Sequence, residues 1–134
     1  GADEFRFEGG TGADALARAE SLGTDTVTDF SAADGDSFGL SDADFGFGDT
    51  GTLTDGVDYF EHASVTLSAT PLDASSGTSG PAVVVIGDGS GSDGFSVYYT
   101  DDASAMTTGN SYQIAEVENA NTGNVDAGDF NLKT

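Results

Sequence analysis

Short apolar stretches separated by turns rich in glycine and aspartate run along most of the chain. Residues 82–87 (AVVVIG) form a continuous apolar run, and residues 94–100 (GFSVYYT) alternate, with Phe95, Val97 and Tyr99 on one face. A continuous run of this length is typical of a strand buried on both faces, whereas alternation is typical of a strand with one covered face. Further short strands are expected at residues 25–30, 36–41, 57–69, 111–118 and 129–132. In the segment 111–118 the apolar positions change phase after Ile114, which predicts a bulge or an end twist.

Helical signals are weak in comparison. Residues 13–22 (ADALARAESL) have good helix propensity, but they lack a capping box and their apolar stripe is thin. Turn-rich connectors occupy residues 73–81, 87–94 and 118–124. Short strands at this spacing predict an all-β fold, either an antiparallel sandwich or a roll.

Composition adds a strong acidic bias. The 134 residues contain 24 Asp plus Glu against three Lys plus Arg, which gives a formal charge of −21, and 18 of the acids are Asp. Three cations cannot form the basic surface that binds nucleic acid, and anionic membranes repel the chain for the same reason. No apolar stretch approaches the ~20 residues that span a bilayer. The absence of cysteine excludes disulfides, zinc–thiolate sites and thiol catalysis.

The charge leaves several interpretations open. Disorder or a salt-adapted surface would produce such a composition, and so would a folded protein that binds cations. A hydrophobic content of 37%, with nine Phe and four Tyr, argues against disorder and indicates one domain with a useful core. Because the chain begins at Gly1 rather than Met, we expect it to be a processed piece of a longer protein.

A repeat near the N-terminus favours the interpretation that the folded protein binds cations. Residues 9–17 (GGTGADALA) match the nonapeptide G-G-x-G-x-D-x-U-x of calcium-loaded β-rolls, in which U is a large apolar residue. The shorter G-x-D-x-U pattern begins at Gly1, Gly12 and Gly23, at a spacing of 11 residues. Its glycines allow tight turns that expose carbonyl oxygens, its aspartate adds a carboxylate, and calcium prefers such oxygen ligands. The alternative is a hairpin that uses glycine and aspartate only for their turn propensity.

The chain also resembles a known family. Residues 23–30 (GTDTVTDF) and 35–41 (GDSFGLS) are similar to the elements G-x-D-T-I-x-D-F and G-D-x-I-x-L-S that close the β-roll of RTX, or hemolysin-type calcium-binding, proteins. Residues 97–104 (VYYTDDAS) and 112–132 resemble the aromatic strand and the final strand pair of the same C-terminal module, as found in serralysin-like proteins. The middle of the chain, residues 42–93, matches only loosely, and the 11-residue period departs from ideal repeats.

The resemblance implies a fold and a site. It implies a single domain in which residues 1–30 form the turns of a short parallel β-roll and residues 31–134 form an antiparallel β-sandwich cap with a C-terminal secretion signal. It implies calcium as the cofactor, with Asp34 and Asp36 as weaker candidates beside the main ligands. These main ligands are the carboxylates of Asp3, Asp14, Asp25 and Asp29 and the carbonyls of Gly9, Gly10 and Gly12.

The resemblance also implies a function. Modules of this kind are exported by the type I secretion apparatus, remain largely unfolded inside the cell and fold in the calcium-rich exterior. We therefore expect a secreted, extracellular or cell-surface calcium-binding module. Because the sequence contains no P-loop, no dinucleotide-binding glycine motif and no nucleophile elbow, we also expect no enzymatic activity. The alternative is a calcium-stabilised, self-associating structural subunit of an S-layer, matrix or filament. A third interpretation is a salt-adapted domain without a specific calcium site.

Other candidate sites are weaker. His62 lies near Asp58 and Glu61, but without a second histidine or any cysteine a half-exposed strand residue is the better interpretation. The segment 88–94 (DGSGSDG) has the composition of a cation loop, but it lacks the EF-hand spacing and is better read as a flexible hairpin tip. Several aromatic residues could form a carbohydrate platform, although most are expected in the core: Phe45, Phe47, Tyr59, Phe60, Phe95, Tyr98 and Tyr99.

Overall fold

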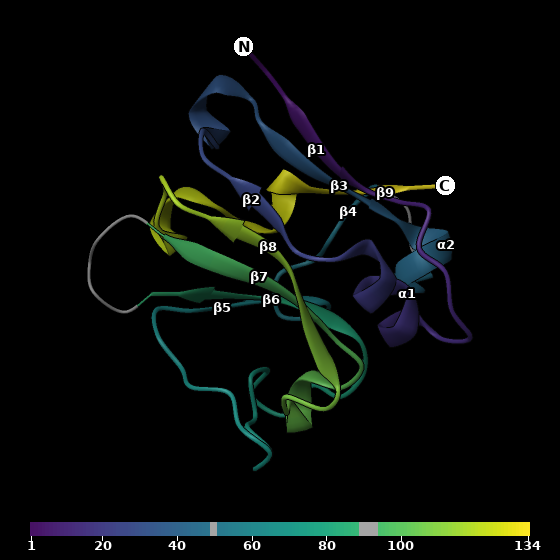
Figure 1. The fold of residues 1–134 in the computed structure, drawn as a ribbon. Helices are drawn as coiled ribbons and strands as arrows, with labels where there is room; N and C mark the ends of the chain where they lie inside the picture. The colour runs from purple at the N-terminus through teal and green to yellow at the C-terminus, as the bar shows by residue number, and fades with distance from the viewer. Residues whose placement is uncertain (49–50, 89–93) are drawn as a thin grey trace.

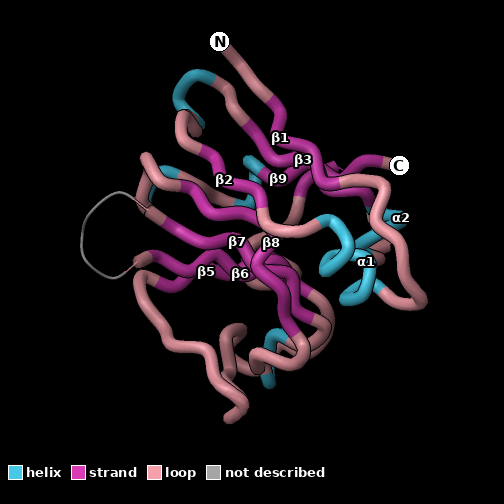
Figure 2. The backbone as a smooth tube through the Cα atoms, in the orientation of Figure 1, coloured by secondary structure: helices cyan, strands magenta, loops and turns pink. Residues whose placement is uncertain are grey.

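Two mixed sheets and two short α-helices make up the chain in the computed structural model, which describes residues 1–48, 51–88 and 94–134 (Figures 1 and 2). The first sheet has the order β1 (Glu4–Phe7), β3 (Ser37–Ser41), β9 (Phe130–Lys133), β4 (Gly51–Thr52). The second has the order β2 (Asp25–Val27), β8 (Ser111–Val117), β7 (Phe95–Thr100), β6 (Ala82–Gly87), β5 (Tyr59–His62). The helices are α1 (Ala15–Leu22) and α2 (Asp42–Phe45), and single 3-10 turns are η1 (Ala32–Asp34), η2 (Ala103–Ala105), η3 (Thr122–Asn124) and η4 (Ala127–Asp129).

The predicted all-β fold, a parallel roll followed by an antiparallel sandwich, is wrong. Both sheets mix parallel and antiparallel pairs, and the fold is mixed α/β. The strands of residues 1–30 do not stack on one another, because β1 pairs with β3 in one sheet and β2 pairs with β8 in the other. Between them the segment that follows Asp14 forms α1, since the Asp14 carboxylate caps this helix without a full capping box.

The main core lies where the two sheets meet, and aromatic rings fill much of it. Phe38 of β3 stacks on Phe130 of β9 with ring centroids 4.8 Å apart, and Phe30 stacks on Phe38 at 4.9 Å. The second sheet contributes Tyr59 and Phe95, which approach Phe130 and Phe30 at 5.3 and 6.1 Å. These residues are at most 2% exposed, so the rings hold the two sheets together.

A second, smaller core covers the other face of the β5–β7 sheet. Val84 and Ile86 of β6 pack there with Met106, whereas Val83 and Val85 face the main core. The covering segment is residues 63–81, joined to residues 102–108 by main-chain hydrogen bonds such as Leu72 N to Met106 O at 2.9 Å. The prediction that residues 82–87 are buried on both faces is therefore confirmed.

The expected strands differ from the observed ones mainly in length. The segment 57–69 contributes only β5, and its later apolar residues, Val65 and Leu67, pack on the second core outside any strand. The predicted bulge is confirmed, because the β7–β8 register shifts between Val97 and Tyr98 and leaves Ile114 as the extra residue. β1, β4 and α2 are additional elements that the pattern did not predict.

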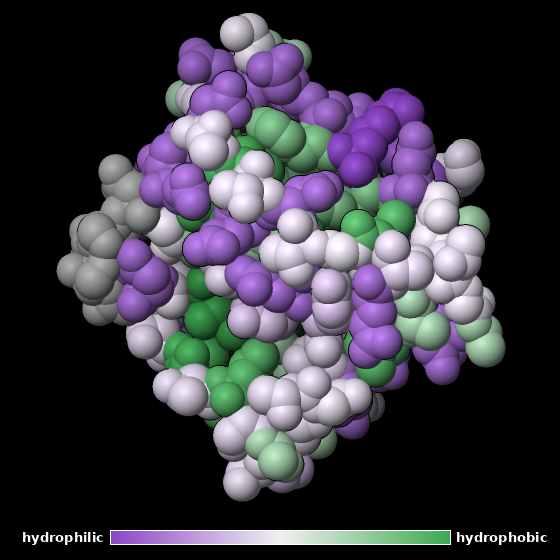
Figure 3. All heavy atoms as spheres, in the orientation of Figure 1, coloured by the Kyte–Doolittle hydropathy of each residue, from purple (hydrophilic) through white to green (hydrophobic). Residues whose placement is uncertain are grey.

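Hydrophilic and intermediate residues cover most of the face shown in Figure 3, and apolar residues are visible in several small patches, one of them near β5 and β6. Among the described residues, no helix has the length and hydrophobicity needed to cross a membrane.

Candidate functional site

Asp14, one of the predicted calcium ligands, lies at the start of α1. Its Oδ1 accepts a hydrogen bond from the main-chain N of Ala17 at 2.8 Å, and the exposed carboxylate is the N-cap of α1. The sequence motif therefore supplies a helix cap at this position, where a β-roll would use the aspartate for calcium.

Asp3 and Asp36 are the two predicted ligands that the fold brings together. Asp36 is 4% exposed, and its two oxygens accept hydrogen bonds from Asp3 N at 2.8 Å and Ser31 N at 2.9 Å. The buried carboxylate thus ties the start of β1 to the turn before β3. Asp34 lies nearby in η1 and is exposed.

Asp25 and Asp29 lie elsewhere. Asp25 is exposed in β2, paired in register with Ala115 of β8, and Asp29 is exposed just after this strand. Asp14, at the start of α1, is thus separate from Asp25 and Asp29, which lie in and just after β2. Within residues 1–48, 51–88 and 94–134, no group of three or more His, Cys, Asp or Glu side chains is placed to hold a metal ion. As arranged here, the predicted ligands do not form one calcium cage.

The three glycines of the nonapeptide lie in a loop that packs against α1 at Gly10 and Gly12. Gly9 and Gly12 have positive φ values of 83° and 149°. A Cβ on Gly10 would lie 2.7 Å from the carbonyl oxygen of Arg18, so only glycine fits this close approach. The guanidinium of Arg18 donates to the carbonyl oxygens of Gly12 at 3.3 Å and Asp44 at 2.8 Å, which joins the loop, α1 and α2.

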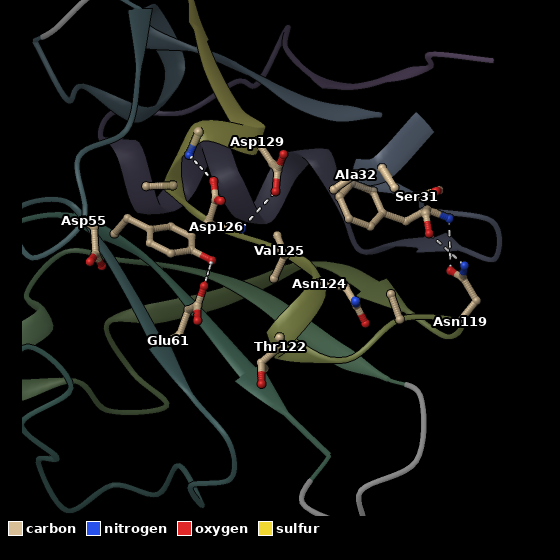
Figure 4. Close-up of a pocket in the computed structure, with 17 residues that line it drawn as sticks. Ser31, Ala32, Asp55, Glu61, Asn119, Thr122, Asn124, Val125, Asp126 and Asp129 are labelled. Atoms are coloured by element: carbon tan, nitrogen blue, oxygen red, sulfur yellow. Dashed lines mark hydrogen bonds between the residues drawn. The ribbon is translucent and has the colours of Figure 1, made fainter. Parts of the chain in front are cut away.

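A cavity of about 930 Å³ has none of the predicted ligands in its lining, although its lining residues 30–33 lie between Asp29 and Asp34 in the chain. It is lined by the turn at η1, by Tyr59 and Glu61 of β5, and by the segment 119–129 (Figure 4). Four of its lining residues are acidic and none is basic: Asp55, Glu61, Asp126 and Asp129. The acids come from two stretches of chain, residues 55–61 and 126–129, so the proximity of the two pairs has no signal in the sequence.

Hydrogen bonds fix several of these acids. Tyr59 donates its hydroxyl to Glu61 Oε1 at 2.7 Å. Asp126 and Asp129 form a reciprocal cap around η4: Asp126 Oδ1 accepts from Gly128 N at 2.8 Å, and Asp129 Oδ2 accepts from Asp126 N at 2.9 Å. Figure 4 shows Asp126 and Asp129 on one side of the cavity and Glu61 on the other.

Burial and neighbouring negative charges raise the pKa of two carboxyl groups in the cavity. Partial desolvation raises the pKa of Glu61, and the charges of Asp55, Asp126 and Asp129 raise it further, although the Tyr59 hydrogen bond acts in the opposite direction. Desolvation, with the charge of Asp126, also raises the pKa of Asp129. Chemically, the cavity favours protons and cations over anions.

The weaker candidates of the sequence analysis are a histidine, a glycine-rich loop and a set of aromatic residues. His62 is half-buried in β5, as predicted, and its Nε2 lies 2.7 Å from the carbonyl oxygen of Ala74 in the covering segment. Residues 89–93 of the suspected cation loop lie outside the described residues, whereas β6 and β7 on either side pair as a hairpin. Five of the seven candidate platform aromatics are at most 9% exposed, and only Phe47 and Tyr98 are half-buried.

Comparisons of the chain with protein-family models, with curated protein sequences and with solved structures gave no match.

Proposed function

We propose that the chain is an extracellular, calcium-binding, non-catalytic module of RTX type, which supports type I secretion and folds when it meets calcium. The observation that carries the proposal is the complete nonapeptide at residues 9–17 within three G-x-D-x-U half-motifs at a spacing of 11 residues. The apolar U residues of all three half-motifs, Phe5, Leu16 and Val27, pack on the main core. Ordering these turns is thereby linked to forming the core.

The distribution of charge supports a cation-dependent fold. Against 24 acids there are three bases. Arg6 pairs with Glu4 and Glu8, and Lys133 pairs with Glu4 at 2.9 Å, so the described ion pairs gather at β1 and β9. Most of the negative charge therefore repels itself in the compact state, and bound cations would relieve this repulsion.

The position of the last strand supports folding after export. β9 lies between β3 and β4, and Phe130 is fully buried against Phe38 and Tyr59. The first sheet therefore cannot be completed without residues 130–133. A chain kept unfolded in a calcium-poor cell would present this segment to the secretion apparatus as extended polypeptide.

Calcium titration followed by circular dichroism tests the proposal. The parent should gain structure and thermal stability with millimolar calcium, and far less with sodium at the same ionic strength. Asp14→Asn and Asp25→Asn remove carboxylate ligands, and asparagine keeps the helix cap at position 14. Both variants should need higher calcium concentrations.

Asp73→Asn is the matched control, because Asp73 also accepts main-chain hydrogen bonds in a turn but lies outside the motifs. It should respond to calcium like the parent. If chelation produces no cooperative change, and Asp14→Asn behaves like the parent, the proposed calcium site is refuted.

A further inference from the structure

One edge of the first sheet is open. β1 stands at the end of the order β1-β3-β9-β4, and within the described residues no strand pairs with its outer side (Figure 1). Open strand edges present rows of main-chain donors and acceptors that another strand can use.

The phase of the β1–β3 ladder determines which groups face outward. Ser37 N donates to Asp3 O at 2.9 Å. Because alternate residues of a parallel ladder bond to the same neighbour, the main-chain groups of Asp3, Phe5 and Phe7 face β3. Those of Glu4 and Arg6 consequently face the open edge.

The side chains of β1 alternate between exposed and at least partly buried positions with the same period of two. Phe7 is buried and Phe5 is half-buried, whereas Glu4 and Arg6 are exposed. Phe5 contacts Phe38 and Phe30 at centroid distances of 5.8 and 6.4 Å, so its ring lies at the margin of the core. A strand added at this edge would cover the rest of the Phe5 ring.

We propose that the open edge of β1 pairs with β1 of a second copy of this chain, in an antiparallel arrangement whose twofold axis passes at Phe5. Glu4 of each copy then lies opposite Arg6 of the other, and the outward main-chain groups of both residues bond across the axis. The two Phe5 rings meet in the non-hydrogen-bonded pair, where side chains are closest.

Charge complementarity selects this register. Moving the axis to Arg6 would place two arginines opposite each other and Glu4 opposite Glu8, and like charges in such pairs are destabilising. The Phe5 register keeps the paired residues within or next to β1 (Glu4–Phe7). The interface needs no calcium, and it closes on itself as a dimer with no filament growth, so it is independent of the proposed function.

Net charge sets the salt dependence of this dimer. Each copy carries −21, so the copies repel one another at low ionic strength. Added salt screens this repulsion, since the Debye length falls from ~10 Å at 0.1 M to ~3 Å at 1 M. The dimer should therefore strengthen as sodium chloride is raised.

Sedimentation velocity over a concentration series, in a chelator and at two salt concentrations, tests the proposal. Arg6→Pro removes a main-chain donor at the open edge and should weaken dimerisation about tenfold relative to Arg6→Ala, which has the same charge. Arg6→Glu should weaken it by about the same factor, because both cross-strand pairs become repulsive.

Disulfide trapping gives an independent readout in a chain without cysteine. Two Phe5→Cys copies would face each other across the axis and should oxidise to a covalent dimer, whereas exposed Glu20→Cys on α1 should not. A monomer at every concentration and salt, with no trapped dimer, overturns the proposal. A dimer that is insensitive to Arg6→Pro and to Arg6→Glu overturns it equally, because its interface lies elsewhere.

Discussion

The carboxylate of Asp36 accepts the main-chain N–H of Asp3 at 2.8 Å, across 33 positions of sequence. The same carboxylate accepts the N–H of Ser31, so one buried side chain satisfies two main-chain donors where β1 and β3 begin their parallel ladder. Aspartate serves in this way throughout the protein, and its carboxylates accept main-chain N–H groups at many turns and helix starts. Examples are Asp14, Asp42, Asp44, Asp58, Asp73, Asp102 and Asp126.

Asp36→Ala should destabilise the protein strongly even in a chelator. Two partly buried N–H groups lose their acceptor, and each unsatisfied group costs about 1–3 kcal/mol. Urea unfolding should show a loss of about 2 kcal/mol or more in the free energy of unfolding. Exposed Asp34→Ala in the adjacent turn should stay within about 0.5 kcal/mol of the parent. Equal effects at both positions would contradict the structural role of Asp36.

Variants of Asp14 can distinguish its role as a helix cap from its proposed role as a calcium ligand. In a chelator, Asp14→Ala should cost about 1 kcal/mol through the lost helix cap, and Asp14→Asn should remain close to the parent. With calcium present, both variants should lack part of the gain that calcium gives the parent. Thermal unfolding with and without calcium measures both effects. A full calcium response in Asp14→Asn would assign Asp14 to the cap alone.

Phe130 should be among the most sensitive positions of the core. It is fully buried, stacked on Phe38 at 4.8 Å and close to Tyr59 at 5.3 Å. Phe130→Ala should lower the free energy of unfolding by about 3–5 kcal/mol, because it leaves a cavity between the two sheets. Val57→Ala, at a side chain that is 59% exposed, is the control and should change little. Denaturant unfolding that shows a small loss for Phe130→Ala would place this strand outside the cooperative core.

The acidic cavity should make stability depend on pH. A carboxyl group whose pKa is raised on folding binds more protons in the native state, so Glu61 and Asp129 cost stability as pH rises through their raised pKa values. Glu61→Gln should therefore raise the melting temperature at pH 7, and its advantage should shrink as the pH falls through the raised pKa of Glu61, where the parent's carboxyl becomes protonated.

The effect should stay below about 1 kcal/mol, because solvent screens a partly exposed carboxyl. Glu20→Gln, on the exposed side of α1, is the control for removing one charge and should show less of this pH dependence. Identical pH profiles for Glu61→Gln and Glu20→Gln would show that the cavity acids do not interact.

Most strands could be predicted from the sequence, and their partners could not. The run AVVVIG identifies β6 and its burial on both faces, because a local pattern reports which side chains must leave water. The same pattern placed β2, β3, β7, β8 and β9 near their observed positions. It missed the bounds and partner of β1, because Phe5 was interpreted as the apolar residue of a G-x-D-x-U half-motif in a β-roll.

For the candidate sites, the sequence identified residues with local backbone roles. It could not show which acidic residues lie close together, because that depends on contacts between distant parts of the chain. Gly9 and Gly12 adopt positive φ values and Asp14 caps a helix, which are local consequences of residue type. The cavity acids Asp55, Glu61 and Asp129 meet only after β5, η4 and the turn before β5 have packed together.

The sequence by itself determined the acidic charge, the alternation of short apolar stretches with turns, and the residue types at those turns. Each of these depends on a residue and its near neighbours. Tertiary structure alone decided that β1 pairs with β3 and β2 with β8, because strands exchange similar main-chain hydrogen bonds with many possible partners. The choice among them is made by the packing of distant side chains, above all the stack of Phe30, Phe38 and Phe130 between the two sheets.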